Sequence, residues 1–436
     1  MKTNGCFSTA RRLRSCSGRI LWRGMGAAAV LLLLFSHARC ARAQDAPPAP
    51  ITLDQAIAIA RAHNPILLSA EQNLLATRAQ EAQAGVRENP YFTLYGNNLS
   101  NPATSSTPYA YSLQLSRLFE RGQKRRWRLD GARATTAETD AGNRDQIRQT
   151  ILQVEQAFTG MLLAKASLQL AQDNLKDYGR ELDISRERYK AGDLGKLDFE
   201  RLDLQLSQFE TDEVTAEQNL VQASDQLQVL LGYPHPRKGF DIVGDITPPA
   251  IHATLTDLEQ RALSARPDYQ EAHDAVRVAD AGVKLAYANG TADPTLEGEY
   301  DHSGTLSSYG FYVTVPVRIF DRNQGNKATA KFQAQAARFS EIASRNQVYA
   351  DVDQAWVTYL AAKKLADRYQ GHYLDEAKDV LSIAQFAYQH GGLALIDYLN
   401  AVQDNRSTAL NALNAEAQTW LAIHQLSYAS AVPLVP

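Results

Sequence analysis

The sequence predicts a mainly α-helical fold with a small β part, built from two copies of one long helical hairpin. Two proline-free stretches indicate this, 109–233 and 317–432, in a chain of 436 residues that contains 16 prolines. Proline collects in turns and loops, so runs of this length are typical of long helices. Each run contains one glycine break, at 191–195 and at 390–394. These breaks predict two hairpin tips.

Landmarks of the first half recur in the second half about 200 residues later. The Arg-Pro pair at 266–267 follows the Asn-Pro pair at 64–65 by 202 residues, and Gly391 follows Gly192 by 199. Repetition of several landmarks in one order indicates an internal duplication. We therefore expect a first repeat at 44–232, a linker at 233–254 and a second repeat at 255–432.

Residues 1–43 are expected to be a cleaved signal peptide. They hold eight basic residues and no acidic ones, an apolar core at 27–35 and an Ala-x-Ala cleavage site at 41–43. The paired arginines at 11–12 leave a twin-arginine export route open. All three cysteines lie in this segment, and lipidation of Cys40 is the alternative to cleavage after Ala43.

Without this leader the chain has 37 basic and 48 acidic residues, a net charge of −11. A surface of this sign argues against nucleic acid as a partner. After the leader, no segment reaches the roughly 18 consecutive apolar residues of a membrane-spanning helix. If the protein crosses a membrane, it is expected to do so as strands.

Each repeat is expected to begin with helical segments and a β-hairpin. In the first repeat, the helical pattern from Leu53 breaks at 64–65 and resumes over 66–86. Strands are then predicted at about 91–97 and 109–119, because aromatic and β-branched residues alternate with polar ones there. Taken alone, this hairpin also fits a small soluble sheet packed on a core.

The longest helix is predicted at 123–189, with a return helix at 196–231. Apolar residues recur in steps of three, four and seven between Ile147 and Tyr189. Such heptad spacing predicts helices that lie side by side as in coiled coils. An unbroken helix of this length would extend for about 100 Å.

The second repeat has the same plan, with strands at about 295–300 and 309–320. Pro316 lies within the second of these and marks a bend or a strand end. Four strands are too few to close a barrel, since about eight is the practical minimum. We therefore expect several copies of the chain to share one barrel.

This order of elements resembles the TolC family of outer-membrane efflux and secretion channels. The most specific matches are the tip motifs at 189–198 and 388–397, and the likeness covers about 52–431. The resemblance implies a homotrimer in which four strands from each chain contribute to a twelve-stranded outer-membrane β-barrel, above a periplasmic α-barrel. The motif at 119–125 is weakly similar to the heavy-metal efflux branch.

By the same resemblance, Asp198, Tyr388 and Asp397 occupy positions of a periplasmic gate. Leu393 stands where an arginine partner of the first-tip aspartate is found in the family, and Asn400 replaces a second acidic residue. A hydrogen bond from Tyr388 to Asp198 would then carry more of the closure. The alternative is that the two aspartates only stabilise helix N-termini.

The tips are also the expected docking sites for a periplasmic adaptor. The residues assigned to this role are Gly192, Leu194, Gly195, Gly391, Gly392 and Leu393.

No spacing of residues indicates catalysis or a bound cofactor. The nine histidines are scattered without metal-ligand spacing, and Met161 is the only methionine beyond the leader. No glycine-rich phosphate loop or nucleophile elbow is present. We therefore expect a protein that is not an enzyme, with no cofactor and no metal site.

The sequence thus predicts an outer-membrane exit channel of a tripartite efflux system in a Gram-negative bacterium, with a large periplasmic part. Its partners would be two further copies, a periplasmic adaptor, an inner-membrane pump and outer-membrane lipid. The cargo would be metal ions, drugs or other small solutes. The alternatives are the outer-membrane component of a type I protein secretion system and a soluble periplasmic coiled-coil scaffold.

Overall fold

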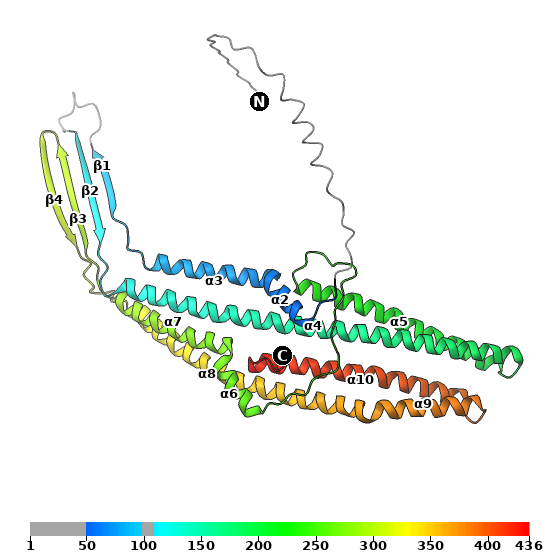
Figure 1. The fold of residues 1–436 in the computed structure, drawn as a ribbon. Coiled ribbons are helices and arrows are strands. Elements are labelled where there is room, and N and C mark those ends of the chain that lie inside the picture. Colours follow the sequence, from blue (N-terminus) through cyan, green and yellow to red (C-terminus); the bar gives the residue numbers. More distant parts are fainter. Residues whose placement is uncertain (1–48, 98–108, 436) are drawn as a thin grey trace, which may run out of the picture. The chain divides into compact units, whose positions relative to one another are not determined.

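The computed structural model describes residues 49–97 and 109–435 (Figure 1). The expected signal peptide at 1–43, with Cys6, Cys16 and Cys40, lies outside these residues. Within the described part, no helix is both long enough and apolar enough to cross a membrane.

The first repeat consists of two short helices, two strands and two long helices. Their bounds are α2 (Leu53–His63), α3 (Pro65–Ala84), β1 (Tyr91–Asn97), β2 (Ala110–Leu118), α4 (Lys124–Ala191) and α5 (Lys196–Leu230). The α4 helix has 68 residues, which at about 1.5 Å each gives a length of about 100 Å. It packs against α5 and α7 along its length (Figure 1).

The second repeat has the same order of elements. Their bounds are α6 (Leu255–Ala265), α7 (Pro267–Asn289), β3 (Thr295–Ser303), β4 (Leu306–Thr314), α8 (Gln324–Arg368), η1 (Tyr369–Tyr373), α9 (Leu374–Gln389) and α10 (Leu395–Ser430). The η1 segment is a π-helical turn between α8 and α9, whereas α4 is continuous. A mainly helical fold with four strands is thereby confirmed.

The junctions between short helices follow from local chemistry. Thr52 and Gln55 form a capping box at the start of α2. The Asn64 side chain accepts a hydrogen bond from the Ile66 amide at 2.8 Å, and Pro65 occupies the first turn of α3. Proline is well suited to that position, because its missing N–H has no partner within the helix.

The four strands form one antiparallel sheet in the order β1-β2-β3-β4. The β2–β3 pair joins the two repeats, with Leu113 opposite Tyr300 and Ser112 opposite Asp301. Because side chains alternate along each strand, this register gives the sheet one continuous set of residues on each face.

The strand predicted at 309–320 is wrong at both ends, because β4 spans Leu306–Thr314. Pro316 explains the early end, since proline has no N–H to donate to a strand ladder. The earlier start follows from a tight turn at Gly304, where φ is +63°. That turn also extends β3 to Ser303, beyond the predicted end at 300.

Three buried apolar clusters form the core. One joins α2, α4 and α5 around Val154 and Leu227, and the equivalent one joins α6, α8 and α10 around Val352 and Leu426. The third contains residues near both hairpin tips. The third cluster fixes the two tips against each other.

Candidate functional site

The first tip is a glycine turn at the end of α4. Gly192 has φ +86°, the left-handed conformation that glycine adopts most easily. Its amide donates to the Tyr189 carbonyl at 3.1 Å, and the Asp193 amide donates to the Arg188 carbonyl at 2.9 Å. These two bonds form a Schellman motif, which ends α4 before α5 begins.

The second tip has the same geometry at the end of α9. Gly391 has φ +75°, and its amide donates to the Tyr388 carbonyl at 3.1 Å. The Gly392 amide donates to the Ala387 carbonyl at 2.8 Å. Both repeats therefore reverse direction through the same hydrogen-bonding pattern.

An aromatic pair supports each turn. Tyr189 stacks on Phe199 with ring centroids 5.0 Å apart, and Tyr388 stacks on Tyr398 at 5.1 Å. The members of each pair lie ten residues apart, one before the turn and one after it. Each pair therefore fastens the start of the return helix to the end of the outgoing helix.

The tip cluster connects the two hairpins. Leu202 from α5, Tyr388 from α9 and Tyr398 from α10 are buried in it, and Leu194 and Leu393 pack against it from the turns. Leu393, which departs from the family pattern, therefore contributes to packing. In the first turn, Gly195 precedes the first residue of α5.

The expected gate residues differ in their surroundings. Tyr388 is 7% exposed, and its hydroxyl has no hydrogen-bond partner within the described part of the chain. Asp198 is half-buried, whereas Asp397 is exposed at the start of α10. The expected hydrogen bond from Tyr388 to Asp198 does not form within one chain.

The electrostatic surroundings of Tyr388 favour its protonated form. Burial raises the pKa of Tyr388, and the carboxylates of Asp198 and Glu181 raise it further, whereas Arg188 opposes them. The Arg188 guanidinium lies 5.9 Å from the ring centroid. Tyr388 therefore presents a neutral hydroxyl that is able to donate a hydrogen bond.

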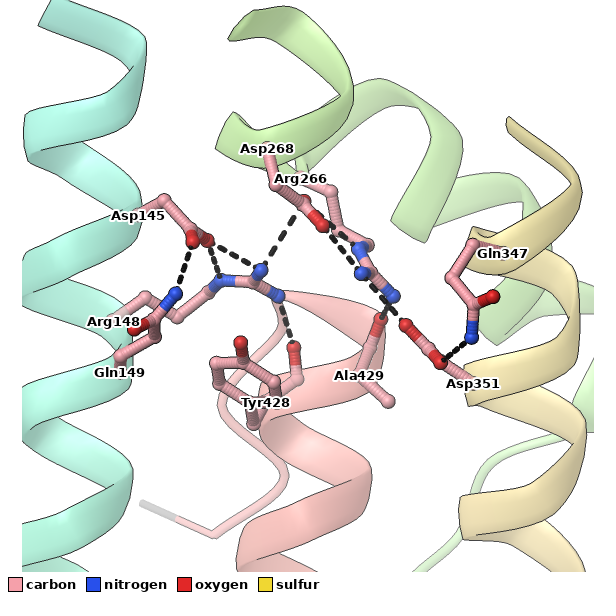
Figure 2. Close-up of polar contacts among 9 residues, drawn as sticks. All are labelled: Asp145, Arg148, Gln149, Arg266, Asp268, Gln347, Asp351, Tyr428 and Ala429. Atoms are coloured by element: carbon pink, nitrogen blue, oxygen red, sulfur yellow. Dashed lines mark hydrogen bonds and ion pairs between the residues drawn. The ribbon is translucent and has the colours of Figure 1, made fainter. Parts of the chain in front are cut away.

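A network of ion pairs that the sequence did not predict lies at the C-terminal end of α10 (Figure 2). The Arg266 side chain is 3% exposed and lies 2.5 Å from Asp268 and 2.8 Å from Asp351. It also donates to the Ala429 carbonyl at 3.3 Å. One guanidinium thus connects the α6–α7 junction, α8 and α10.

Arg148 extends this network to α4. It lies 2.5 Å from Asp145 and 3.1 Å from Asp268, and it donates to the Tyr428 carbonyl at 2.6 Å. Burial opposes ionisation of Asp268, but Arg266 and Arg148 outweigh it, and the net pKa of Asp268 is lowered. The two arginines neutralise the carboxylates and satisfy terminal carbonyls of α10.

The first repeat has a neutral counterpart of this junction. Asn64, at the position equivalent to Arg266, is 2% exposed and donates to the Leu230 carbonyl at 2.8 Å. Leu230 is equivalent to Ala429 by the 199-residue offset. Both side chains thus donate a hydrogen bond to a carbonyl at the end of the last long helix of their repeat.

Over 49–97 and 109–435, no group of three or more histidine, cysteine or acidic residues is arranged to hold a metal ion.

Comparison with known proteins finds a family match over the first repeat and relatives over most of the chain. Residues 56–233 match the family described as outer membrane efflux protein. The chain is 25% identical to the cobalt-zinc-cadmium resistance protein CzcC of Cupriavidus metallidurans, over 86% of this chain and 88% of CzcC. It is also 25% identical to the outer membrane protein TolC of Escherichia coli, over 77% of this chain and 70% of TolC.

The fold matches solved structures as well. A crystal structure of CusC, from work on folding and transmembrane channel formation, superposes with a TM-score of 0.74 at 20% identity. The match covers 87% of this chain and 91% of CusC. The first repeat thus matches the outer membrane efflux protein family, and the fold of the chain, with its duplicated hairpins and four-stranded sheet, is similar to that of CusC.

Proposed function

We propose that this protein is the outer-membrane exit channel of a tripartite efflux system. The observation that carries the proposal is the four-stranded sheet with one exposed apolar face, joined directly to helices of the length that a periplasmic conduit requires. Solutes would pass through it without chemical change, and an inner-membrane pump would supply the energy.

The two faces of the sheet differ sharply in chemistry. One face carries exposed apolar side chains, namely Phe92, Leu94, Leu115, Tyr309, Phe311 and Val313. The opposite face carries polar and acidic side chains, among them Ser112, Gln114, Ser116, Glu297, Glu299 and Asp301, together with three tyrosines, Tyr91, Tyr95 and Tyr312. A wall with lipid on one side and water on the other needs this segregation.

The two edge strands of the sheet, β1 and β4, would pair with those of neighbouring copies. Within the described strands, β1 pairs only with β2, and β4 pairs only with β3. Unpaired strand edges inside lipid are costly, because no water satisfies their backbone groups. Three copies that pair β1 with β4 would form a pore wall of twelve strands.

The tips would form the periplasmic entrance. In this proposal Asp198, Tyr388 and Asp397 contribute to the gate, and the Tyr388 hydroxyl finds its acceptor in the assembled channel. The exposed turns around Gly192 and Gly391 would receive the adaptor, together with Leu194, Gly195, Gly392 and Leu393. The shared Schellman geometry would present two similar turns to it.

The cargo class that the relatives favour is metal cations. CzcC is named for cobalt, zinc and cadmium resistance, and CusC is named as a cation efflux protein in Escherichia coli. We propose that this chain serves a pump for divalent transition-metal ions. Deletion of the gene should then lower the tolerated concentration of these metals while leaving tolerance to organic dyes unchanged.

The channel itself is tested by fractionation and by conductance. The full chain should be recovered in the outer-membrane fraction, require detergent for extraction and crosslink as a trimer. In planar bilayers it should produce discrete single-channel currents. Recovery in the soluble periplasmic fraction, without channel activity, would instead support a coiled-coil scaffold.

A further inference from the structure

The two repeats meet at a cavity between α4 and α10 that contains a carboxyl–imidazole pair. The cavity has a volume of about 1190 Å³ and is lined by parts of α2, α4 and α10, by 243–245 and by the C-terminal residues 431–435. Glu155 of α4 and His424 of α10 both line it. Neither residue belongs to the ion-pair network or to the tip cluster.

The geometry directs one imidazole nitrogen to the carboxyl group. His424 Nδ1 lies 3.5 Å from a carboxyl oxygen of Glu155, and Nε2 lies 3.2 Å from the Thr159 hydroxyl. The ring stacks on Trp420 with centroids 5.4 Å apart. The His424 side chain is 5% exposed and that of Glu155 is 17% exposed.

Burial makes an unbalanced charge costly at this position. A bare carboxylate or an imidazolium loses its hydration shell there, and only a partner charge or a change in protonation relieves the cost. We propose that Glu155 and His424 hold one proton between them, and that this keeps the contact between the two repeats uncharged from mildly acidic to neutral pH.

The pKa values of the two groups agree with this proposal. Burial raises the pKa of Glu155 to about 7 and lowers the pKa of His424 to about 4. Between these values the pair keeps one proton, carried by Glu155 beside a neutral imidazole. Above the range the pair becomes negative, and below it the pair becomes positive.

Other ionisable groups also line the cavity. They are Asp54 and Arg61 of α2, Arg144 and Arg148 of α4, Asp245 of the linker and Tyr428 of α10.

Three of these groups are already engaged. Arg148 is paired with Asp145 and Asp268, and it lies over the Tyr428 ring at 4.0 Å. Arg144 is paired with Asp140 at 3.2 Å.

The two groups have opposite effects on stability as pH changes. Neutral His424 makes its full contribution to folding stability above its unfolded pKa, near 6.5. This contribution is lost as pH falls toward 4. Protonated Glu155 makes its full contribution to folding stability below its unfolded pKa, near 4.5. This contribution is lost as pH rises through 7. Between about 4.5 and 6.5 the two slopes cancel, so the parent contact should be insensitive to pH.

Single substitutions should reveal the two opposite dependences of stability on pH. The test measures hydrogen exchange of α10 amides near His424 in the full chain in detergent, corrected for intrinsic exchange rates, from pH 4.5 to 6.5. Protection in Glu155→Gln should rise with pH, at most about tenfold per pH unit, because one proton is linked to local opening. Protection in His424→Gln should fall with pH by a similar factor.

The parent and the double variant provide the controls. In both, protection of the α10 amides should not change with pH over this range. Flat profiles in both single variants, or slopes of the same sign, would overturn the proposal. If a variant fails to fold, NMR of the histidine-labelled parent decides the matter. His424 should be uncharged at pH 5.5, and a charged His424 at that pH would contradict a proton held on Glu155 beside a neutral imidazole.

Discussion

The ring of Tyr388 lies against the ring of Tyr398 with an interplanar angle of 4°, while its hydroxyl is buried without a hydrogen-bond partner among the described residues. An unpaired buried hydroxyl costs about 1–3 kcal/mol. The aromatic ring is thus well packed within one chain, whereas the hydroxyl is not satisfied there. In the proposed gate, the acceptor for this hydroxyl would come from the assembled channel.

Tyr388→Phe should separate packing from gating. The substitution keeps the ring stack and removes the unpaired hydroxyl, so thermal stability of the unassembled chain should stay equal or rise by about 1 kcal/mol. In planar bilayers, single-channel conductance should rise, as it should in Asp198→Ala. Tyr189→Phe, at the equivalent position of the first tip, is the matched control. Unchanged conductance in both test variants would limit Tyr388 and Asp198 to structural roles.

Gly192→Ala and Gly391→Ala should each destabilise their tip. An added Cβ at either glycine meets no atom within 4 Å, so the cost comes only from the left-handed backbone, about 1–2 kcal/mol. Hydrogen exchange of the tip amides measures this loss of local stability.

Gly179→Ala is the control for the glycine variants, because this glycine lies inside α4 and also has open space around it. It should stabilise the helix by about 0.5–1 kcal/mol. Equal effects at all three sites would show that the tip conformation does not require glycine.

Local patterns were sufficient to predict the long helices and their ends. The sequence predicted a helix at 123–189, and the structure has Lys124–Ala191. Heptad spacing determines which face is buried, and Gly192 supplies the left-handed residue that ends the helix. Both signals lie within a few turns of chain, so no distant contact was needed to read them.

Contacts between distant segments were not predictable in the same way. Pairing of β2 with β3 joins residues such as Gln114 and Glu299, which are 185 positions apart. The sequence also contained no local signal for the contacts of Arg266 with Asp351 and Ala429, because these partners lie on α8 and α10. One clue was available: Arg266 replaces Asn64 at a duplicated helix start, and a charge at such a buried position needs partners.

Arg266→Ala should be among the most destabilising substitutions in the helical part of the chain. It leaves Asp268 and Asp351 without their shared guanidinium and removes the donor to the Ala429 carbonyl, a loss expected to cost about 3–5 kcal/mol. Asn64→Ala, in the neutral counterpart, should cost about 1–2 kcal/mol through one cap and one long-range bond.

The pH dependence of Arg266→Ala provides a sharper test of the network. The pKa of Asp268 is lowered in the folded chain. Ionised Asp268 therefore contributes to folding stability above its unfolded pKa, near 3.8, and this contribution is lost as pH falls below that value. Thermal unfolding from pH 7 to pH 3 should therefore show a weaker acid dependence in the variant than in the parent. Arg180→Ala removes an exposed pair with Asp177 and should change stability by less than about 0.5 kcal/mol, with the acid dependence intact. If both variants lose equal stability, the network at the end of α10 contributes no more than a surface ion pair.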